Sequence, residues 1–499
     1  MEQSVDLVAL SRPSQRVFEA ATPTTTTSRL LITSLLVCAN TVQFISNCVT
    51  IAGGLAISED LGRHLGPGEA NWMPASYPLT QSAFVLICGR LGAVYGHKRL
   101  TLLGCLIFSV FSLVNAFCKS YESFIIARAL TGVGGGLFMP NAVSMITIMI
   151  PPGRLRNLFL GFFAASPPLG AMVGSVLTGV FIQSIGWKWL FVLIAALTAL
   201  ITVWLGYITP KEVPVDRGGK IDYVGAVSGL GSLLLFNVVC NQAPSVGWST
   251  PYVIACLVAT VLLFLAFLIW EKRFASEPIM PLRIFKATSF SALIWVVLLS
   301  YMGFGIILWY SVSWQQVLRN TSVLQTGINF IPFGLASLFS VFLAAWLVSR
   351  VAAQWIMAVG VIVVLGASIL LATMPVQQTY WAQMFPAIVL SGFCPDFVFV
   401  AAQVVASSSV SRRQQGVASS LIGTLNLYGN SLGIGIAAII ESEVNKTSTD
   451  EAGSYRAVLY FSAGICLVGL VLDVVFVRMP KDERDGWDDP VPEEHISSL

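Results

Sequence analysis

The chain has 499 residues, of which 56% are hydrophobic and only 11% are charged, and its mean hydropathy is +0.79. Soluble domains carry about 25% charged residues, so this composition excludes an ordinary soluble protein and indicates a membrane protein. The net charge of +3 comes from Lys and Arg scattered along the chain, which argues against a nucleic-acid partner.

The first 28 residues are polar and rich in Ser and Thr. They contain no short apolar core followed by a small-residue cleavage site, so we expect a cytosolic tail and not a cleaved signal peptide. The first long apolar run begins directly after this tail.

Long apolar runs then fill most of the chain, and a helix needs about 20 such residues to cross a bilayer. By that measure the sequence predicts fourteen spans, at residues 29–54, 71–90, 100–118, 122–148, 157–183, 189–209, 221–240, 251–270, 288–313, 324–348, 355–373, 381–407, 416–441 and 456–477. An even number puts both termini on one side. Because most of the 28 Lys and Arg residues lie in the tails and in the loops on that side, we expect it to be cytosolic.

The predicted spans also repeat at one constant offset, which aligns span 29–54 with span 288–313 and Tyr121 with Tyr380. The predicted fold is therefore an all-α polytopic membrane protein with two six-helix bundles and two extra central spans. Many secondary transporters are built from such repeats and hold the substrate between them. The expected parts are a cytosolic tail (1–28), an N-terminal bundle (29–209), the inserted spans with their flanking cytosolic loops (210–287), a C-terminal bundle (288–477) and a second cytosolic tail (478–499).

Several segments carry a resemblance to a known family. "GRLGAVYGHKRL" (89–100), which follows "NWMPASYPLTQSAFVLIC", resembles the loop motif G-x-L-x-D-R-x-G-[RK]-[RK] of the major facilitator superfamily. "RALTGVGGG" (128–136) and "SPPLGAMVGS" (166–175) are similar to its fourth- and fifth-span motifs. "SRRQQGVASSLIGTLNLYGNSLG" (411–433) and "NVVCNQAPSVGW" (237–248) look like the fourteen-span drug:proton antiporters, among them fungal aminotriazole and boron resistance permeases and secondary-metabolite efflux pumps.

The resemblance implies a gating loop at 89–100, but its acidic residue is missing. Ala93 stands where the family has Asp, and Val94 stands where it has the next Arg. In the family, that Asp locks the loop to neighbouring helices in one state of the transport cycle. The glycines allow a tight turn and the basic residues favour the cytosolic side. The candidate gating residues are Gly89, Arg90, Gly92, Gly96, Lys98 and Arg99.

The fifth-span motif is also incomplete, because Ser166, Ala171 and Ser175 replace two of its glycines and its proline. Gly170 and Gly174, one helical turn apart, still permit close contact with another helix. Export is thus implied by the family and only partly by this motif.

Ionisable residues deep in a span cost about 2.5 to 3.5 kcal/mol on insertion scales, so they indicate function. Asp222 and Asp473 lie near span ends, so we regard them as weaker candidates for functional residues. Arg128 and Asp396 are stronger candidates, because each is flanked by apolar residues and their two spans match across the repeat. The repeat places them about 13 Å apart along the helix axis, so we expect no direct ion pair. We expect Asp396 to accept the coupling proton and Arg128 to assist through cavity water.

Polar and aromatic residues in three spans are candidates for the substrate cavity. They are Asn40, Gln43 and Asn47, on one face of the first span together with Thr50, and Tyr301, Trp309, Tyr310, Asn426 and Asn430. The alternative for the polar residues is contact between helices, and for the aromatic residues an interfacial belt.

Other features narrow the possible function. The chain has no phosphate-binding G-x-x-x-x-G-K-[ST] loop, its nine cysteines fall in or at the ends of spans, and no nucleophile or metal-ligand cluster occurs within the spans. The sequence therefore predicts neither an enzyme nor any cofactor or metal.

We expect a monomeric proton-coupled exporter of small organic molecules, in the plasma membrane or alternatively the vacuolar membrane. A permease for a nutrient or a small inorganic solute such as borate or ammonium is the alternative. Asn445, in the motif Asn-Lys-Thr of an outer loop, is a predicted glycosylation site.

Overall fold

The structure is a computed structural model that describes residues 26–478 except 64–65, 151–153, 211, 213, 215, 217–218, 276–283, 286–288, 349, 411–414 and 448–449. The regular elements in these ranges are helices. They are α2 (Thr26–Ala52), α3 (Gly54–Asp60), α4 (Trp72–Tyr95), α5 (His97–Phe117), α6 (Tyr121–Met149), α7 (Arg154–Ser184), α8 (Trp187–Ile208), α9 (Tyr223–Val246), α10 (Pro251–Arg273), α11 (Phe290–Ser313), the π-helix η3 (Trp314–Leu318), α12 (Val323–Asn329), α13 (Ile331–Val348), α14 (Ala353–Ala372), α15 (Met384–Ser409), α16 (Gln415–Asn445) and α17 (Glu451–Phe476).

Thirteen helical segments among the described residues are long and apolar enough to cross a membrane. The one predicted span outside this set is 71–90, which is α4. This helix is 24 residues long but carries polar side chains such as Thr80 and Gln81. It packs against α6 on one side and α16 on the other, and much of its length is buried. A helix covered by protein on two sides needs less apolar surface than one that faces lipid, which explains why α4 is the least hydrophobic span.

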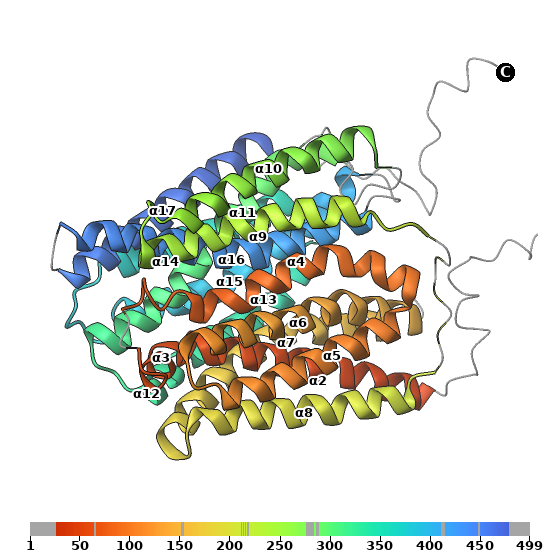
Figure 1. Ribbon diagram of the computed structural model, residues 1–499, viewed down its shortest axis with the longest axis horizontal. Helices are drawn as coiled ribbons and strands as arrows, with labels where there is room; N and C mark the ends of the chain where they lie inside the picture. Colours follow the sequence, from red (N-terminus) through yellow and green to blue (C-terminus); the bar gives the residue numbers. More distant parts are fainter. Residues whose placement is uncertain are drawn as a thin grey trace, which may run out of the picture.

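The long helices form two groups that lie side by side (Figure 1). The N-terminal group contains α2 and α4 to α8, and the C-terminal group contains α11 and α13 to α17. Contacts between the groups run along two seams, α4 with α16 and α7 with α12 and α13. This arrangement confirms the predicted fold class, whereas the exact domain boundaries stay a prediction.

The inserted helices α9 and α10 pack against each other, and α9 also covers the α4–α16 seam. Three hydrogen bonds of 2.9 Å hold α9 there. Ser431 Oγ of α16 donates to Asn237 Oδ1, while Asn71 Nδ2 and Trp72 Nε1, at the start of α4, donate to Asn241 O and Gln242 Oε1. The insertion is therefore bonded to both halves.

Equivalent glycines bring helices into close contact in each half. A Cβ atom on Gly174 would lie 2.8 Å from the backbone oxygen of Ile45 in α2, and one on Gly433 would lie 2.4 Å from that of Met302 in α11. Real Cβ atoms do not approach this closely, so only glycine fits at either position. The predicted helix contact of Gly170 and Gly174 is thus present between α7 and α2, and the C-terminal half repeats it.

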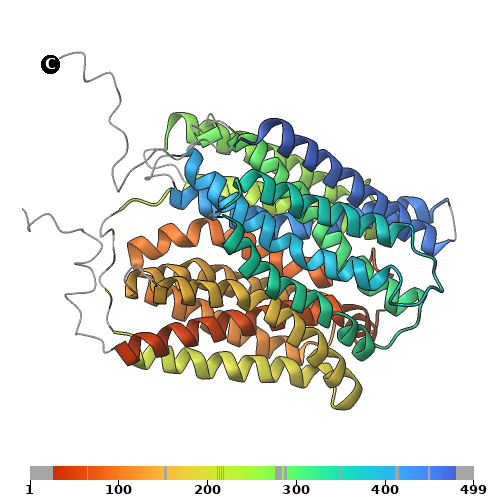
Figure 2. The same ribbon diagram turned by 180° about the vertical axis from the view of Figure 1, so that it is seen from behind.

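The bundle has two ends, seen from both sides in Figures 1 and 2. At one end α2 begins, α10 and α17 end, and α4 turns into α5. We call it the basic face because Arg90, Lys98, Lys220 and Lys272 lie there. The other end, which carries α3, α12 and the last turn of α16, is called the opposite face.

Candidate functional site

A cavity of about 1720 Å³ lies between the two halves, and side chains of both halves line it. Arg90, Lys220 and Lys272 line it at the basic face, where Lys220 and Lys272 are exposed and Arg90 is partly exposed. At its other end the cavity stops beneath Ala52 and Trp309, which are both buried. The cavity is therefore open to the basic face and closed toward the opposite face.

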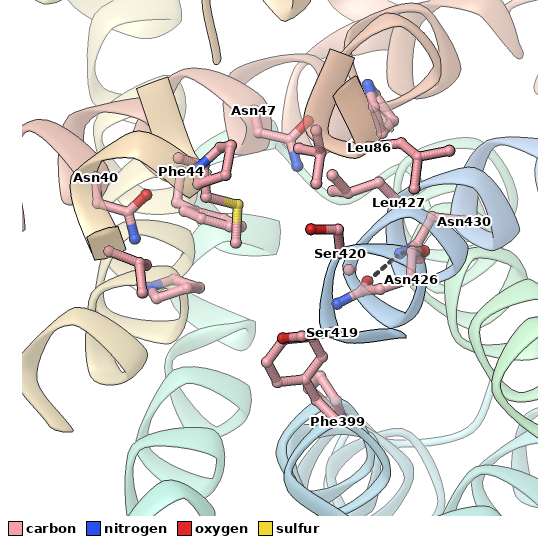
Figure 3. Close-up of a pocket in the computed structure, with 18 of the residues that line it drawn as sticks. Asn40, Phe44, Asn47, Leu86, Phe399, Ser419, Ser420, Asn426, Leu427 and Asn430 are labelled. Carbon is pink, nitrogen blue, oxygen red and sulfur yellow. Dashed lines mark hydrogen bonds between the residues drawn. The ribbon is translucent and has the colours of Figure 1, made fainter. Parts of the chain in front are cut away.

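The polar residues that were predicted to lie on one face of α2 point in two directions. Asn40 and Asn47 line the cavity (Figure 3), and the side-chain oxygen of each lacks a hydrogen-bond partner among the described residues. Asn40 Nδ2 donates to Ser166 Oγ at 2.6 Å, which fixes its amide. Gln43 is not part of the lining, and its Oε1 is 3.5 Å from the hydroxyl of Tyr77. Gln43 therefore faces α4 in this conformation, and its role in the substrate cavity stays a prediction.

The wall opposite Asn40 and Asn47 is formed in part by α16. Asn426 and Asn430 line the cavity, and Asn430 Nδ2 donates to Asn426 Oδ1 at 3.3 Å; their contact with substrate stays a prediction. Figure 3 shows these amides together with Ser420 across the cavity from Asn47. Amides therefore face the cavity from both halves, offering donors and acceptors without fixed charge.

Of the three predicted aromatic residues of α11, Trp309 alone lines the cavity. Tyr301 instead donates its hydroxyl hydrogen to the backbone oxygen of Pro395 at 2.7 Å, and Tyr310 donates to Glu441 Oε2 at 2.6 Å. Tyr310 therefore points toward α16 and Tyr301 toward α15, whereas Trp309 faces the cavity. The roles of Tyr301 and Tyr310 in the substrate cavity stay predictions.

Asp396 lies on α15 and lines the cavity from the C-terminal half. Its Oδ2 accepts hydrogen bonds from Ser337 Oγ, at 2.7 Å, and from Ser340 Oγ, both of α13. Pro395 stands inside α15 directly before it, and the hydroxyl of Tyr301 satisfies the Pro395 carbonyl. The two serines were not predicted, although their spacing of three residues puts them on one face of a span.

Arg128 does not line the cavity in this conformation, and its predicted part in proton coupling stays a prediction. Its side chain is fully buried, and it donates to Ser46 Oγ at 2.9 Å, to Ser46 O at 3.1 Å and to Thr50 Oγ1 at 3.4 Å. The guanidinium also lies 4.9 Å from the centre of the Tyr77 ring, a cation–π contact. Arg128 therefore fastens α6 to α2 and α4. The hydrogen-bond partners of Asp396 are instead serines of the other half.

The loop that lacks the family's acid obtains one from the segment between α8 and α9. Arg90 Nη1 lies 2.6 Å from Asp216 Oδ2, and the Asp216 amide donates to the backbone oxygen of Ala93 at 2.9 Å. Glu212 accepts from the amides of His97 at 3.0 Å and Lys98 at 2.6 Å, at the start of α5. Carboxylates suit a helix N-terminus, so this linker holds the turn in place.

The other residues of the turn have separate structural roles. A Cβ atom on Gly92 would lie 1.8 Å from Asn141 Oδ1, and Gly96 has φ = +103°, so both positions require glycine. Gly89 lines the cavity, whereas Arg99 is exposed. The Lys98 ammonium donates to the backbone oxygens at the end of α8.

Two further acids lie near the cavity. Asp222 lines it and caps α9, accepting from the Gly225 amide and from Trp270 Nε1 at 2.8 Å each. Glu271, at the end of α10, also lines it and was not predicted. By contrast, Asp473 is buried in α17 away from the cavity, and Asn445 is exposed at the opposite face.

Comparison with known proteins identifies the family. A family model described as Major Facilitator Superfamily matches residues 35–434 and 320–497. The chain belongs to the major facilitator superfamily. It is accordingly a multi-pass membrane protein that transports small molecules, and it is not an enzyme.

Individual relatives cover most of the chain. It is 30% identical to the efflux pump terJ of Aspergillus terreus, over 85% of this chain and 83% of the relative. It is also 30% identical to a low affinity ammonium transporter of Saccharomyces cerevisiae, over 82% and 81%. The crystal structure of an auto-inhibited POT family peptide transporter superposes with a TM-score of 0.65 at 16% identity, over 91% of this chain and 99% of that one, which shows the shared fold.

Proposed function

We propose that this transporter exports small organic molecules in exchange for protons, by alternating access of the cavity to the two sides of the membrane. The observation that carries the proposal is a large cavity between the halves that reaches one face only and holds Asp396 in its wall. With the basic face in the cytosol, as the distribution of Lys and Arg predicts, this conformation is open inward. Both termini are then cytosolic.

The proposed proton site is Asp396. Its carboxylate accepts hydrogen bonds from the hydroxyls of Ser337 and Ser340 and lines the cavity. A carboxyl group open to cavity water can release a proton to the cytosol in this conformation and accept one when the cavity opens outward. We propose that Arg128 contributes indirectly, because it fixes the position of α2, which carries Asn40 and Asn47.

The cavity lining suits an amphipathic organic substrate. Uncharged amides face it from α2 and α16, and apolar side chains including Phe44, Phe399 and Leu427 lie between them (Figure 3). Ligand pockets for drug-sized molecules measure about 300–1,000 Å³, so this space accommodates a molecule larger than an ammonium or borate ion. The similarity to the efflux pump terJ supports export as the direction of transport.

A permease for a small inorganic solute remains the second candidate, and the 30% identity to an ammonium transporter favours it. Purified protein in sealed vesicles distinguishes the two. An imposed pH gradient should drive organic substrates out of the compartment that corresponds to the cytosol, whereas a permease would move ammonium down its own gradient. A deletion strain screened for sensitivity to drugs and endogenous metabolites, and for their retention, would supply the substrates for this assay.

The decisive variant is Asp396→Asn, which keeps the side-chain shape but removes the titratable group. We expect it to lose transport driven by the pH gradient and to remain folded in the membrane. Asp222→Asn is the matched control, because Asp222 lines the same cavity and Asn is an equally good helix cap. Full pH-driven transport by Asp396→Asn would refute the proposed role of Asp396.

A further inference from the structure

The closed opposite face is held by contacts that cross from one half to the other. Trp309 Nε1 of α11 donates to the backbone oxygen of Pro67, in the loop before α4, at 3.1 Å. Gln316 Nε2, next to α11, donates to the backbone oxygen of Ala52 at the end of α2 at 2.7 Å. When the cavity opens on this side, these contacts must separate.

A buried carboxyl group lies among these contacts. Glu441, in the last turns of α16, is only 4% exposed. Its Oε2 accepts from the hydroxyl of Tyr310 at 2.6 Å, and the backbone amide of Gly68 donates to the carboxylate from the other half. A Cβ atom on Gly68 would lie 3.0 Å from the Glu441 carboxyl carbon, so glycine allows this approach. Glu441 thus belongs to the C-terminal half and touches the N-terminal half.

No cation balances this group among the described residues that face it. The titratable groups around Glu441 are Tyr310 on α11, Tyr455 and Glu451 on α17, and Glu69 in the loop before α4. Two of these are carboxyl groups, whose negative charge opposes a further negative charge nearby. An ionised Glu441 would therefore be costly to enclose, because a buried charge needs an opposite charge or full hydrogen bonding.

Opening and closing change the surroundings of Glu441 in a predictable way. In a state open to the opposite face, Gly68 and Glu441 move apart with their halves, and water can reach the carboxyl group. Closing removes that water. Enclosing the neutral acid costs less free energy than enclosing the carboxylate, so a proton bound from that side favours closure.

We propose that Glu441 is a second proton-binding site, located in the gate at the opposite face, and that this gate closes when Glu441 is protonated. The proposal rests on the alternating access proposed above, but it does not depend on the role of Asp396. If an ionised Glu441, held by Tyr310 and Gly68, locked the gate instead, high pH would favour closure, and the two cases therefore predict opposite responses to pH.

The test measures the distance between the halves at the opposite face. Spin labels are attached to Lys119→Cys and Gln377→Cys, two exposed loop positions in different halves, with the nine native cysteines replaced. In the parent protein the ratio of closed to open molecules should rise as pH falls, by up to about tenfold per pH unit for one proton. Glu441→Gln should stay closed across the range, because its neutral amide imitates the protonated acid.

Matched variants distinguish titration of Glu441 from titration of neighbouring carboxyl groups and of Asp396. Glu443→Gln, two residues further along and exposed beside Lys446, should respond like the parent. In an Asp396→Asn background the pH response of the gate should persist, even if that variant has lost transport. An unchanged response in Glu441→Gln, or closure at high pH in the parent, would overturn the proposal.

A second substitution covers the case in which Glu441→Gln does not fold. Tyr310→Phe removes the hydroxyl that donates to Glu441 Oε2, and with it part of the support for an ionised carboxylate in the closed gate. The closed gate is then less stable while Glu441 is ionised, so the pH at which half of the molecules are closed should fall. A rise or no change in that midpoint would contradict the proposed site.

Discussion

Asp216 should take the place of the acid that is missing at Ala93, and Asp216→Asn tests this directly. In the conformation described here Asp216 pairs with Arg90, which lines the cavity at the basic face. The cavity must narrow there when the basic face closes, so we expect Arg90 to leave Asp216 in that state. Loss of the Asp216 carboxylate should consequently favour closure of the basic face.

The size of the effect follows from the exposure of the pair. The side chains of Arg90 and Asp216 are 37% and 44% exposed, and ion pairs in such positions contribute about 0.2–1 kcal/mol. That energy changes an equilibrium between two conformations by about 1.4- to 5-fold. Asp216→Asn should shift the population by this factor, which is within reach of a distance measurement but too small to prevent folding.

The assay places spin labels at Leu155→Cys and Val351→Cys, exposed positions of the two halves at the basic face. Glu443→Gln, at the opposite face, controls for net charge. An unchanged population in Asp216→Asn would refute the reasoning.

Three further predictions follow from the packing and from the orientation. Arg128→Ala should lose transport and stability, because it removes the donors to α2, whereas Arg128→Lys should retain part of both, as seen by uptake and thermal unfolding. Gly433→Ala should have a free energy of unfolding about 1–3 kcal/mol lower than that of Gly464→Ala, because only the first substitution forces a Cβ atom against backbone. Both substitutions gain equally in helix propensity. Equal free energies of unfolding would contradict the close contact. On intact cells an impermeant thiol reagent should label Lys446→Cys and leave Val351→Cys unlabelled, and the reverse result would invert the proposed orientation.

The sequence predicted those features that depend on residues within a single span. The spacing of Gly170 and Gly174 predicted a close helix contact, and the structure shows one between α7 and α2. Apolar length likewise predicted the helices, including α4, where polar residues that would be costly in lipid are covered by protein. Asp396 and the amides of α16 lie where the polar residues in apolar spans indicated.

Features that depend on the rotation of a helix about its axis, or on partners far along the chain, could not be predicted from the sequence. Trp309 and Tyr310 are adjacent in the chain, and only the packing of α11 decides which of them faces the cavity. Arg128 looked like a cavity residue because charge in a span indicates function, but hydroxyl and carbonyl oxygens of α2 enclose it. The pairing of Arg90 with Asp216 joins the end of α4 to a linker far along the chain, for which no local pattern exists.

The hydrogen bonds between α9 and both halves mean that the α4–α16 seam and the α7–α13 seam resist separation to different degrees. Asn237 and Asn241 tie α9 to α16 and to the start of α4, so parting the α4–α16 seam breaks hydrogen bonds worth about 1 kcal/mol each. The α7–α13 seam is held instead by small-residue contacts such as that of Gly334 with Met172. The halves should therefore pivot about the side that α9 covers, and the α7–α13 side should separate more than the α4–α16 side during the transport cycle.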